Sequence, residues 1–227
     1  VSSVTPQVKC NESSLDPVIF SGTVTGTTYA WSNSQPSIGI GANGSGNISS
    51  VALTNTTSSP IVGIFLVTPT ANSCSGPAGT FTITVNPKPD VIANPATQNI
   101  CTGQSTSINL SGNVAGTSYN WTVTQVDVLG ASAGSGNSIT QVLNTNSTNF
   151  GIANYTITPT ANNCLGNPIV VPINITPKPV IVATPPLQTI CSGHSRTAIK
   201  VWSIPNRILY KCHKEYGRQS SVKSSYC

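Results

Sequence analysis

Hydrophobic and polar side chains alternate with a period of two along much of the chain. The alternation is clearest at residues 80–85, 106–110 and 155–158. Successive side chains of an extended strand point to opposite faces, so this period predicts strands with one buried face. The same stretches are rich in Thr, Val, Ile and aromatic residues, which fit a half-buried pleated surface. No stretch before Ser195 shows a helical stripe, and we therefore expect an all-β fold.

Short clusters of glycine, serine and asparagine separate the expected strands. They lie at residues 41–46, 75–79 and 131–137. Several short strands with turns at regular intervals indicate antiparallel β-sandwiches. No run approaches the ~18 apolar residues of a membrane helix, so we expect no membrane insertion.

The chain repeats itself at a fixed period of 90 positions. Three motifs occur twice: Thr-Pro-Thr-Ala-Asn-x-Cys at 68–74 and 158–164, Gly-Thr-x-Tyr-x-Trp at 26–31 and 116–121, and Pro-Lys-Pro at 87–89 and 177–179. The opening Ile-Cys-x-Gly-x-Ser at 100–105 returns at 190–195 and, in a weaker form, around Cys10. A fixed period of this kind is the signature of a repeat architecture. We predict β-sandwich repeats at 1–88 and 89–178, followed by an incomplete third repeat with a divergent basic tail at 179–227.

The Pro-Lys-Pro linkers bias the backbone towards an extended, semi-rigid path. Such a connector holds neighbouring domains apart and in line, which suits a rod better than a two-domain enzyme with a cleft. The third unit loses the pattern, because Trp202 follows Cys191 by 11 positions rather than 20 or 21. We expect a poorly ordered C-terminal segment. We interpret the tail from about Lys200 as a fragment end, a shifted reading frame or an artefact, the alternative being a basic tail that contacts an acidic partner.

Charge is scarce and unevenly placed. Charged residues make up 7% of the chain, and the net charge is +5. Residues 1–194 hold three lysines against four acidic residues, a net charge of −1, whereas residues 195–227 hold seven basic residues against Glu215. Three lysines cannot build a groove that follows phosphates, so no nucleic-acid partner is expected. The chain has no methionine and no recognisable leader, so we expect a processed chain or an internal piece of a longer one.

Cysteine spacing is the strongest chemical signal. Each complete repeat holds two cysteines, and these four are the disulfide candidates: Cys10 and Cys74, 64 positions apart, and Cys101 and Cys164, 63 positions apart. Paired cysteines indicate an oxidising compartment. No Cys-x-x-Cys occurs and the only histidines are His194 and His213, so a zinc site lacks ligands at the usual spacing.

The connectivity of these disulfides has two solutions. In an immunoglobulin-like path the two cysteines of one repeat would lie at opposite ends of the sandwich. A strand of ~7 residues spans roughly 23 Å, whereas bridged Cα atoms lie within about 7 Å. Either the first strand is kinked so that Cys101 reaches Cys164, or the bonds join adjacent domains. We favour pairing within each repeat and leave pairing between domains open.

Two aromatic pairs recur after a Gly-Thr turn, Tyr29 with Trp31 and Tyr119 with Trp121. Each pair occupies alternate positions of one expected strand, as a sugar-stacking platform or a core anchor would. A buried Trp on the third strand is a hallmark of immunoglobulin-like sandwiches. Aromatic residues make up only 6% of the chain, which leaves little for a binding face. We interpret these four residues as core anchors.

The residues for catalysis are missing before position 194. No histidine precedes His194, so no Ser-His or Cys-His dyad can be drawn, and the four acidic residues are scattered. The glycines at 39–44 lie between strands and open no helix, which disfavours a phosphate site. We therefore expect no enzyme activity, no metal and no cofactor.

The repeat unit resembles the PKD-like, immunoglobulin-fold repeats found in tandem in large secreted surface or adhesin-like proteins of Bacteroidetes. The resemblance covers about Cys10 to Gly193 and rests on the cysteine, Tyr-x-Trp, Thr-Pro-Thr-Ala-Asn-x-Cys and Pro-x-Pro motifs. PKD domains proper carry Trp-x-Phe-Gly-Asp-Gly, whereas Ser-Asn-Ser follows Trp31 and Thr-Val-Thr follows Trp121. No binding residue of the family is therefore carried over.

This resemblance implies a non-catalytic extracellular module, secreted or at the cell surface. Its implied partners are the neighbouring repeats of the same chain, and surface glycans or a host or substratum surface. Our first hypothesis is a structural spacer in a repeat-containing surface protein. The alternative is a carbohydrate-binding accessory module of a secreted hydrolase, in which exposed aromatic rings would stack on sugars.

Overall fold

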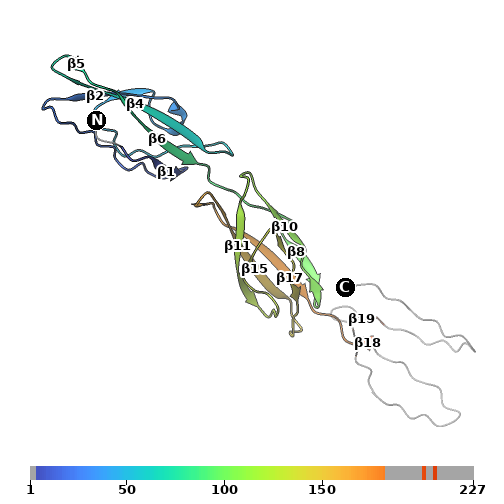
Figure 1. The fold of residues 1–227 in the computed structure, drawn as a ribbon. Coiled ribbons are helices and arrows are strands. Elements are labelled where there is room, and N and C mark those ends of the chain that lie inside the picture. Colours follow the sequence, from blue (N-terminus) through green and yellow to red (C-terminus); the bar gives the residue numbers. More distant parts are fainter. Residues whose placement is uncertain (1–3, 182–200, 203–206, 209–227) are drawn as a thin grey trace, which may run out of the picture.

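The chain folds into two elongated β-sandwiches that follow one another end to end (Figure 1). The structure, a computed structural model, describes residues 4–181 and the backbone of 201–202 and 207–208. Strands make up the regular structure of residues 4–181 apart from one short 3-10 helix, η1 (Pro36–Ile38). The all-β prediction is confirmed. The expectation of a poorly ordered tail concerns residues that are mostly outside the described part of the chain.

The first repeat is built on one sheet with the order β1-β6-β4-β2-β3, on which β5 pairs with β4. Its strands are β1 (Gln7–Cys10), β2 (Thr28–Asn33), β3 (Asn43–Ser45), β4 (Ile61–Ala71), β5 (Cys74–Ser75) and β6 (Gly79–Asn86). Only β1 and β6 run parallel to each other, and the other pairs are antiparallel. The second layer of this sandwich, which faces the sheet, contains the isolated antiparallel bridges Ser14–Ala52 and Val18–Ile48.

The second repeat has the same main sheet, in the order β8-β17-β15-β11-β12 with β16 on β15. Its strands are β8 (Gln98–Cys101), β11 (Ser118–Val126), β12 (Gly134–Ser135), β15 (Gly151–Ala161), β16 (Cys164–Leu165) and β17 (Ile169–Thr176). The facing layer holds β7 (Ile92–Asn94), β9 (Gln104–Ser105), β10 (Ile108–Ser111), β13 (Ser138–Ile139) and β14 (Val142–Leu143). Beyond both repeats, β18 (Val201–Trp202) pairs with β19 (Arg207–Ile208).

Each repeat has its own hydrophobic core between its two layers. The period of two explains it: along β4, Phe65 and Val67 are buried while Ile64 and Leu66 are exposed. Phe65 stacks on Phe81 with a centroid distance of 4.8 Å. The position of Phe65 is taken by Tyr155 in the second repeat, which is also fully buried. The Tyr155 hydroxyl donates a hydrogen bond of 2.7 Å to Oε1 of Gln141, so its polar end is satisfied.

The recurring aromatic residues differ in burial between the repeats. Tyr29, Tyr119 and Trp121 are buried, whereas Trp31 is only half-buried at the edge of its core. The Trp121 ring covers Gly134 of β12, and its Nε1 donates to the carbonyl of Ser132 at 3.3 Å. The Trp31 Nε1 has no partner among the described residues. That these rings anchor the cores stays a prediction, which the substitutions in the Discussion test.

Candidate functional site

The two cysteines of each repeat lie at opposite ends of it. Cys101 is the neighbour of Thr176 at the end of β17, and Cys10 is the neighbour of Asn86 at the end of β6. Cys164 instead follows the far end of β15, an 11-residue strand. At 3.3–3.4 Å per residue, such a strand spans roughly 35 Å. A bond between the cysteines of one repeat is therefore out of reach.

The disulfide joins Cys10 of the first repeat to Cys164 of the second, with a Cα–Cα distance of 5.6 Å and a sequence separation of 154. The pairing within repeats, which we favoured from the sequence, is wrong. The alternative of a bond between adjacent domains is confirmed, because end-to-end stacking brings the C-terminal end of one repeat to the N-terminal end of the next (Figure 1). Cys74, the counterpart of Cys164, is an exposed free thiol at the opposite end of the first repeat.

Polar contacts around the disulfide connect the same two ends. The Asn86 side chain donates a hydrogen bond of 3.1 Å to the carbonyl of Asn162. Asn162 and Asn163 have φ values of 49° and 60°, in the left-handed region that asparagine tolerates in a tight turn. Lys88 of the linker forms an ion pair at 2.7 Å with Glu12 of the first repeat, so this pair does not reach the second repeat. This pair is partly exposed to water and contributes little, whereas the disulfide and the Asn86 contact fix the two ends together.

The linker itself lies on the second repeat. A Cβ built on Gly166 would overlap the carbonyl oxygen of Pro89, and one on Gly112 would overlap that of Asp90. Asp90 and Asn113 exchange two hydrogen bonds. The backbone N–H of Asp90 donates to Oδ1 of Asn113 at 3.2 Å, and the backbone N–H of Asn113 donates to Oδ1 of Asp90 at 2.6 Å. We call the surface formed by Gly112, Asn113 and Gly166, with the nearby Tyr119 and Pro159, the linker seat.

The linker seat also affects the hydroxyl of Tyr119. Burial raises the pKa of Tyr119, and the carboxylate of Asp90 raises it further. Both effects favour the neutral phenol, because burial disfavours a charged phenolate and a second negative charge repels it. Tyr119 is therefore a neutral group at neutral pH that helps to form the seat.

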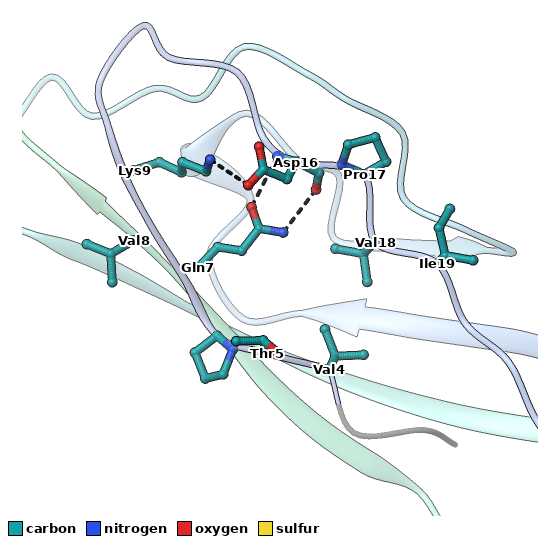
Figure 2. A pocket seen from close by; sticks show the side chains of 10 residues that line it. Val4, Thr5, Gln7, Val8, Lys9, Asp16, Pro17, Val18 and Ile19 are labelled. Carbon is teal, nitrogen blue, oxygen red and sulfur yellow. Dashed lines mark hydrogen bonds and ion pairs between the residues drawn. The ribbon is translucent and has the colours of Figure 1, made fainter.

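A shallow hollow on the first repeat, with a volume of about 490 Å³, lies between β1 and residues 16–19 (Figure 2). Its polar groups satisfy one another. Lys9 forms an ion pair with Asp16 at 2.7 Å, and Gln7 exchanges hydrogen bonds with the backbone of Asp16 at 2.9 and 3.1 Å. In the second repeat Gln98 likewise accepts from the backbone of Ser107 at 3.1 Å. The polar side chains around the hollow thus hold β1 against residues 16–19.

The described part of the chain holds no group of three or more His, Cys, Asp or Glu residues that could bind a metal ion. It likewise contains no helix that is long and apolar enough to cross a membrane. The arrangement that the residues do build is a covalent and packed joint between two repeats. The sequence pattern identifies the cysteines of this joint but not Asn86, Asp90 or Asn113. The glycines at 76 and 166, 90 positions apart, were the available signal for the linker seat.

Residues 7–89 and 98–179 each match the family model of the PKD-like domain. A search of curated proteins finds no match. Solved structures with similarity include the N-terminal four Ig domains of Dscam1 isoform 6.9 (TM-score 0.33, 12% identity, 77% of this chain and 43% of that chain) and the N-terminal eight Ig domains of DSCAM isoform 1.30.30 (0.32, 10%, 87% and 29%). A third is Dpr2 Ig1-Ig2 in complex with DIP-Theta Ig1-Ig3 (0.29, 11%, 78% and 63%). The chain spans less than two thirds of the length of each of these three proteins.

Proposed function

The chain belongs to the PKD-like domain family, and on this basis we propose that it is a non-catalytic spacer, a stiff segment of a repeat-containing extracellular protein. The observation that carries the proposal is the Cys10–Cys164 bond. A spacer that projects a distant part of a protein must keep its domains in line. The disulfide, the Asn86–Asn162 hydrogen bond and the seated linker all restrict bending at the joint.

The bond also changes the path that a pulling force would take through the molecule. Tension applied at the N-terminal end passes along β1 to Cys10, crosses to Cys164, and leaves through β16 and β17. Since β1 and β17 are already extended strands, this path can lengthen very little. The residues between the two cysteines are bypassed, so neither core has to resist unfolding by force. This is the mechanical property that a surface spacer needs.

We further propose that the protein is secreted or located at the cell surface, in large surface proteins of the kind that the sequence resemblance implies in Bacteroidetes. Support comes from the interdomain disulfide, because such bonds persist in oxidising compartments. The proposed partner is the neighbouring repeat, which the first repeat contacts through Asn86 and Cys10. Surface glycans or a substratum stay a prediction from the resemblance. The carbohydrate-binding alternative needs the recurring rings to be exposed, whereas Tyr29, Tyr119 and Trp121 are buried and Trp31 is half-buried.

Small-angle X-ray scattering of the full chain tests the spacer proposal. The oxidised protein should show one rigid, extended arrangement of the two repeats, and Cys10→Ser should broaden the distribution of interdomain distances. Cys74→Ser is the matched control, because Cys74 forms no bond in the structure and its replacement should leave the scattering unchanged. An oxidised protein as flexible as Cys10→Ser would contradict the proposal.

A further inference from the structure

The outer end of the first repeat carries a hollow that corresponds to the linker seat of the second. It has a volume of about 450 Å³, and the described residues that line it all belong to the first repeat. Four of its residues match four at the linker seat, 90 positions later: Gly22 to Gly112, Tyr29 to Tyr119, Pro69 to Pro159 and Gly76 to Gly166. We call this hollow the outer seat. It lies beside β5, at the end of the molecule farthest from the second repeat (Figure 1).

We propose that the outer seat receives the Pro-x-Pro linker of another PKD-like repeat, and that Cys74 then forms a disulfide with the first cysteine of that repeat. Such a repeat would supply what Cys10 and Pro89 supply to the second repeat. The inference rests on the proposed spacer function and extends it, because it gives the rod a defined way to continue beyond its first repeat.

The free thiol is placed as its bonded counterpart is. Cys74 follows Ala71 in a hairpin from β4 to β5, as Cys164 follows Ala161 in a hairpin from β15 to β16. The turn residues Asn72 and Ser73 have φ values of 48° and 61°, close to the values of 49° and 60° at Asn162 and Asn163. Cys74 borders the outer seat. A linker in that seat would therefore bring a partner cysteine to Cys74, as it brings Cys10 to Cys164.

Gly76 supplies a second, independent argument. Its φ is not in the left-handed region, and a Cβ built on it would come no closer than 3.2 Å to its nearest neighbour, Pro69. Within the first repeat, a methyl group at this position would require the Pro69 ring to shift by only a few tenths of an ångström. At Gly166 the reason is the carbonyl of Pro89, which leaves no room for a side chain. A linker in the outer seat explains Gly76 in the same way.

The covalent step needs an oxidant, which we take to be a low-molecular-weight disulfide such as oxidised glutathione. By thiol–disulfide exchange, the two cysteine thiols are oxidised to one protein disulfide, losing two electrons and two protons. The small disulfide takes up both and leaves as two thiols. Cys74 is exposed, so both the oxidant and the partner cysteine can reach it.

The test adds one repeat to the complete chain. Residues 1–91 are fused ahead of Val1, so that Pro87, Lys88, Pro89 and Asp90 of the added repeat precede the original first repeat. The added repeat carries Cys74→Ser, so that the original Cys74 is the only one. The protein is folded in a glutathione buffer and alkylated under native conditions. Mass spectrometry then counts Cys74 as reactive when it is alkylated or carries glutathione, and as protected when its peptide is linked to another cysteine of the protein.

Cys74 should be fully reactive in the unfused protein, and the reactive fraction should fall to background in the fusion, where Cys74 is linked to Cys10 of the added repeat. Cys10→Ser in the added repeat should restore full reactivity. Gly76→Ala should restore it too, because its methyl group lies where the linker carbonyl would have to pack. An unchanged thermal midpoint for Gly76→Ala in the unfused protein shows that this variant folds.

Two results overturn the inference: a Cys74 that stays reactive in the fusion, or one that stays protected when the added repeat lacks Cys10. The peptide that links Cys164 to Cys10 is measured in the same digest. If it forms while Cys74 stays reactive, the outer seat fails and the spacer joint stands. If it does not form, the proposed function fails with it.

Discussion

Gly166 lies so close to the carbonyl of Pro89 that no side chain fits between them. This contact, rather than the composition of the linker, decides how the repeats are joined. A Pro-Lys-Pro segment alone would act as a semi-rigid spacer with water around it. Here the end of the linker packs on the linker seat. The Cys10–Cys164 disulfide, with a Cα–Cα distance of 5.6 Å, closes the joint.

Gly166→Ala should therefore disturb the joint. Its Cβ would overlap the Pro89 carbonyl, so the linker must shift, and overpacking of this kind costs roughly 1–3 kcal/mol. Gly76→Ala is the matched control, because its Cβ would meet only the Pro69 ring at 3.2 Å, and it should lower the free energy of unfolding by less than Gly166→Ala does. Urea unfolding of both variants measures the difference. Equal effects of the two substitutions would show that the linker does not pack as described.

Trp121→Ala tests whether the recurring indole anchors a core. Trp121 is 6% exposed, and removal of a buried Trp costs about 3–5 kcal/mol in the free energy of unfolding. Trp31→Ala should cost less, because Trp31 is half-buried and its Nε1 has no partner among the described residues. Chemical denaturation followed by circular dichroism measures both. A loss below about 1 kcal/mol for Trp121 would indicate a surface site instead.

The sequence was sufficient for the fold because its information is local and periodic. The alternation along residues 80–85 places Phe81, Ile83 and Val85 in the core, as the structure shows. The sequence repeat of 90 positions corresponds to two main sheets, one in each repeat, that have the same strand order.

The disulfide partner could not be decided in this way, because it depends on how two separately folded repeats stack. The spacing of 64 positions between Cys10 and Cys74 looks the same for either pairing. Strand length already argued against a bond within one repeat, and the structure shows that this argument was the decisive one. The linker seat was missed because its contacts are made by backbone atoms of Pro89 and Asp90, which no side-chain pattern reports.

Ionisation of Tyr155 should lower the free energy of unfolding at alkaline pH. Burial raises its pKa from 10.0 to about 12, so the folded state keeps the phenol proton that the unfolded chain loses above pH 10. Its contribution is therefore complete below pH 10 and is lost as the pH rises to about 12. Two pKa units correspond to roughly 2–3 kcal/mol.

Tyr155→Phe is the control for this pH dependence, because it keeps the buried ring and removes the titrating hydroxyl. At pH 7 it should be less stable by about 1 kcal/mol, since the hydrogen bond to Gln141 is lost. Between pH 10 and 12 its stability should fall less steeply than that of the original protein. Parallel pH dependences of the two proteins, followed by urea unfolding at each pH, would contradict this assignment.

The ion pair between Lys88 and Glu12 should contribute little to the joint. The two side chains are 28% and 66% exposed, so water and salt screen the attraction. Glu12→Gln should change the free energy of unfolding by less than about 1 kcal/mol, and the change should shrink as salt is added. Urea unfolding at low and high ionic strength measures it. A larger effect that persists at high salt would mean that the pair is not screened and that it fixes the linker on the first repeat.

Single-molecule force spectroscopy measures whether tension passes through the Cys10–Cys164 bond. The full chain is pulled between Val4 and Pro177, with and without a reducing agent. In the oxidised protein the chain between Cys10 and Cys164 is bypassed, and we predict that neither repeat releases length before the covalent path breaks. After reduction both repeats should unfold and release roughly 500 Å, at about 3.3–3.6 Å for each of the bypassed residues. Equal extension of the oxidised and reduced proteins would contradict the account.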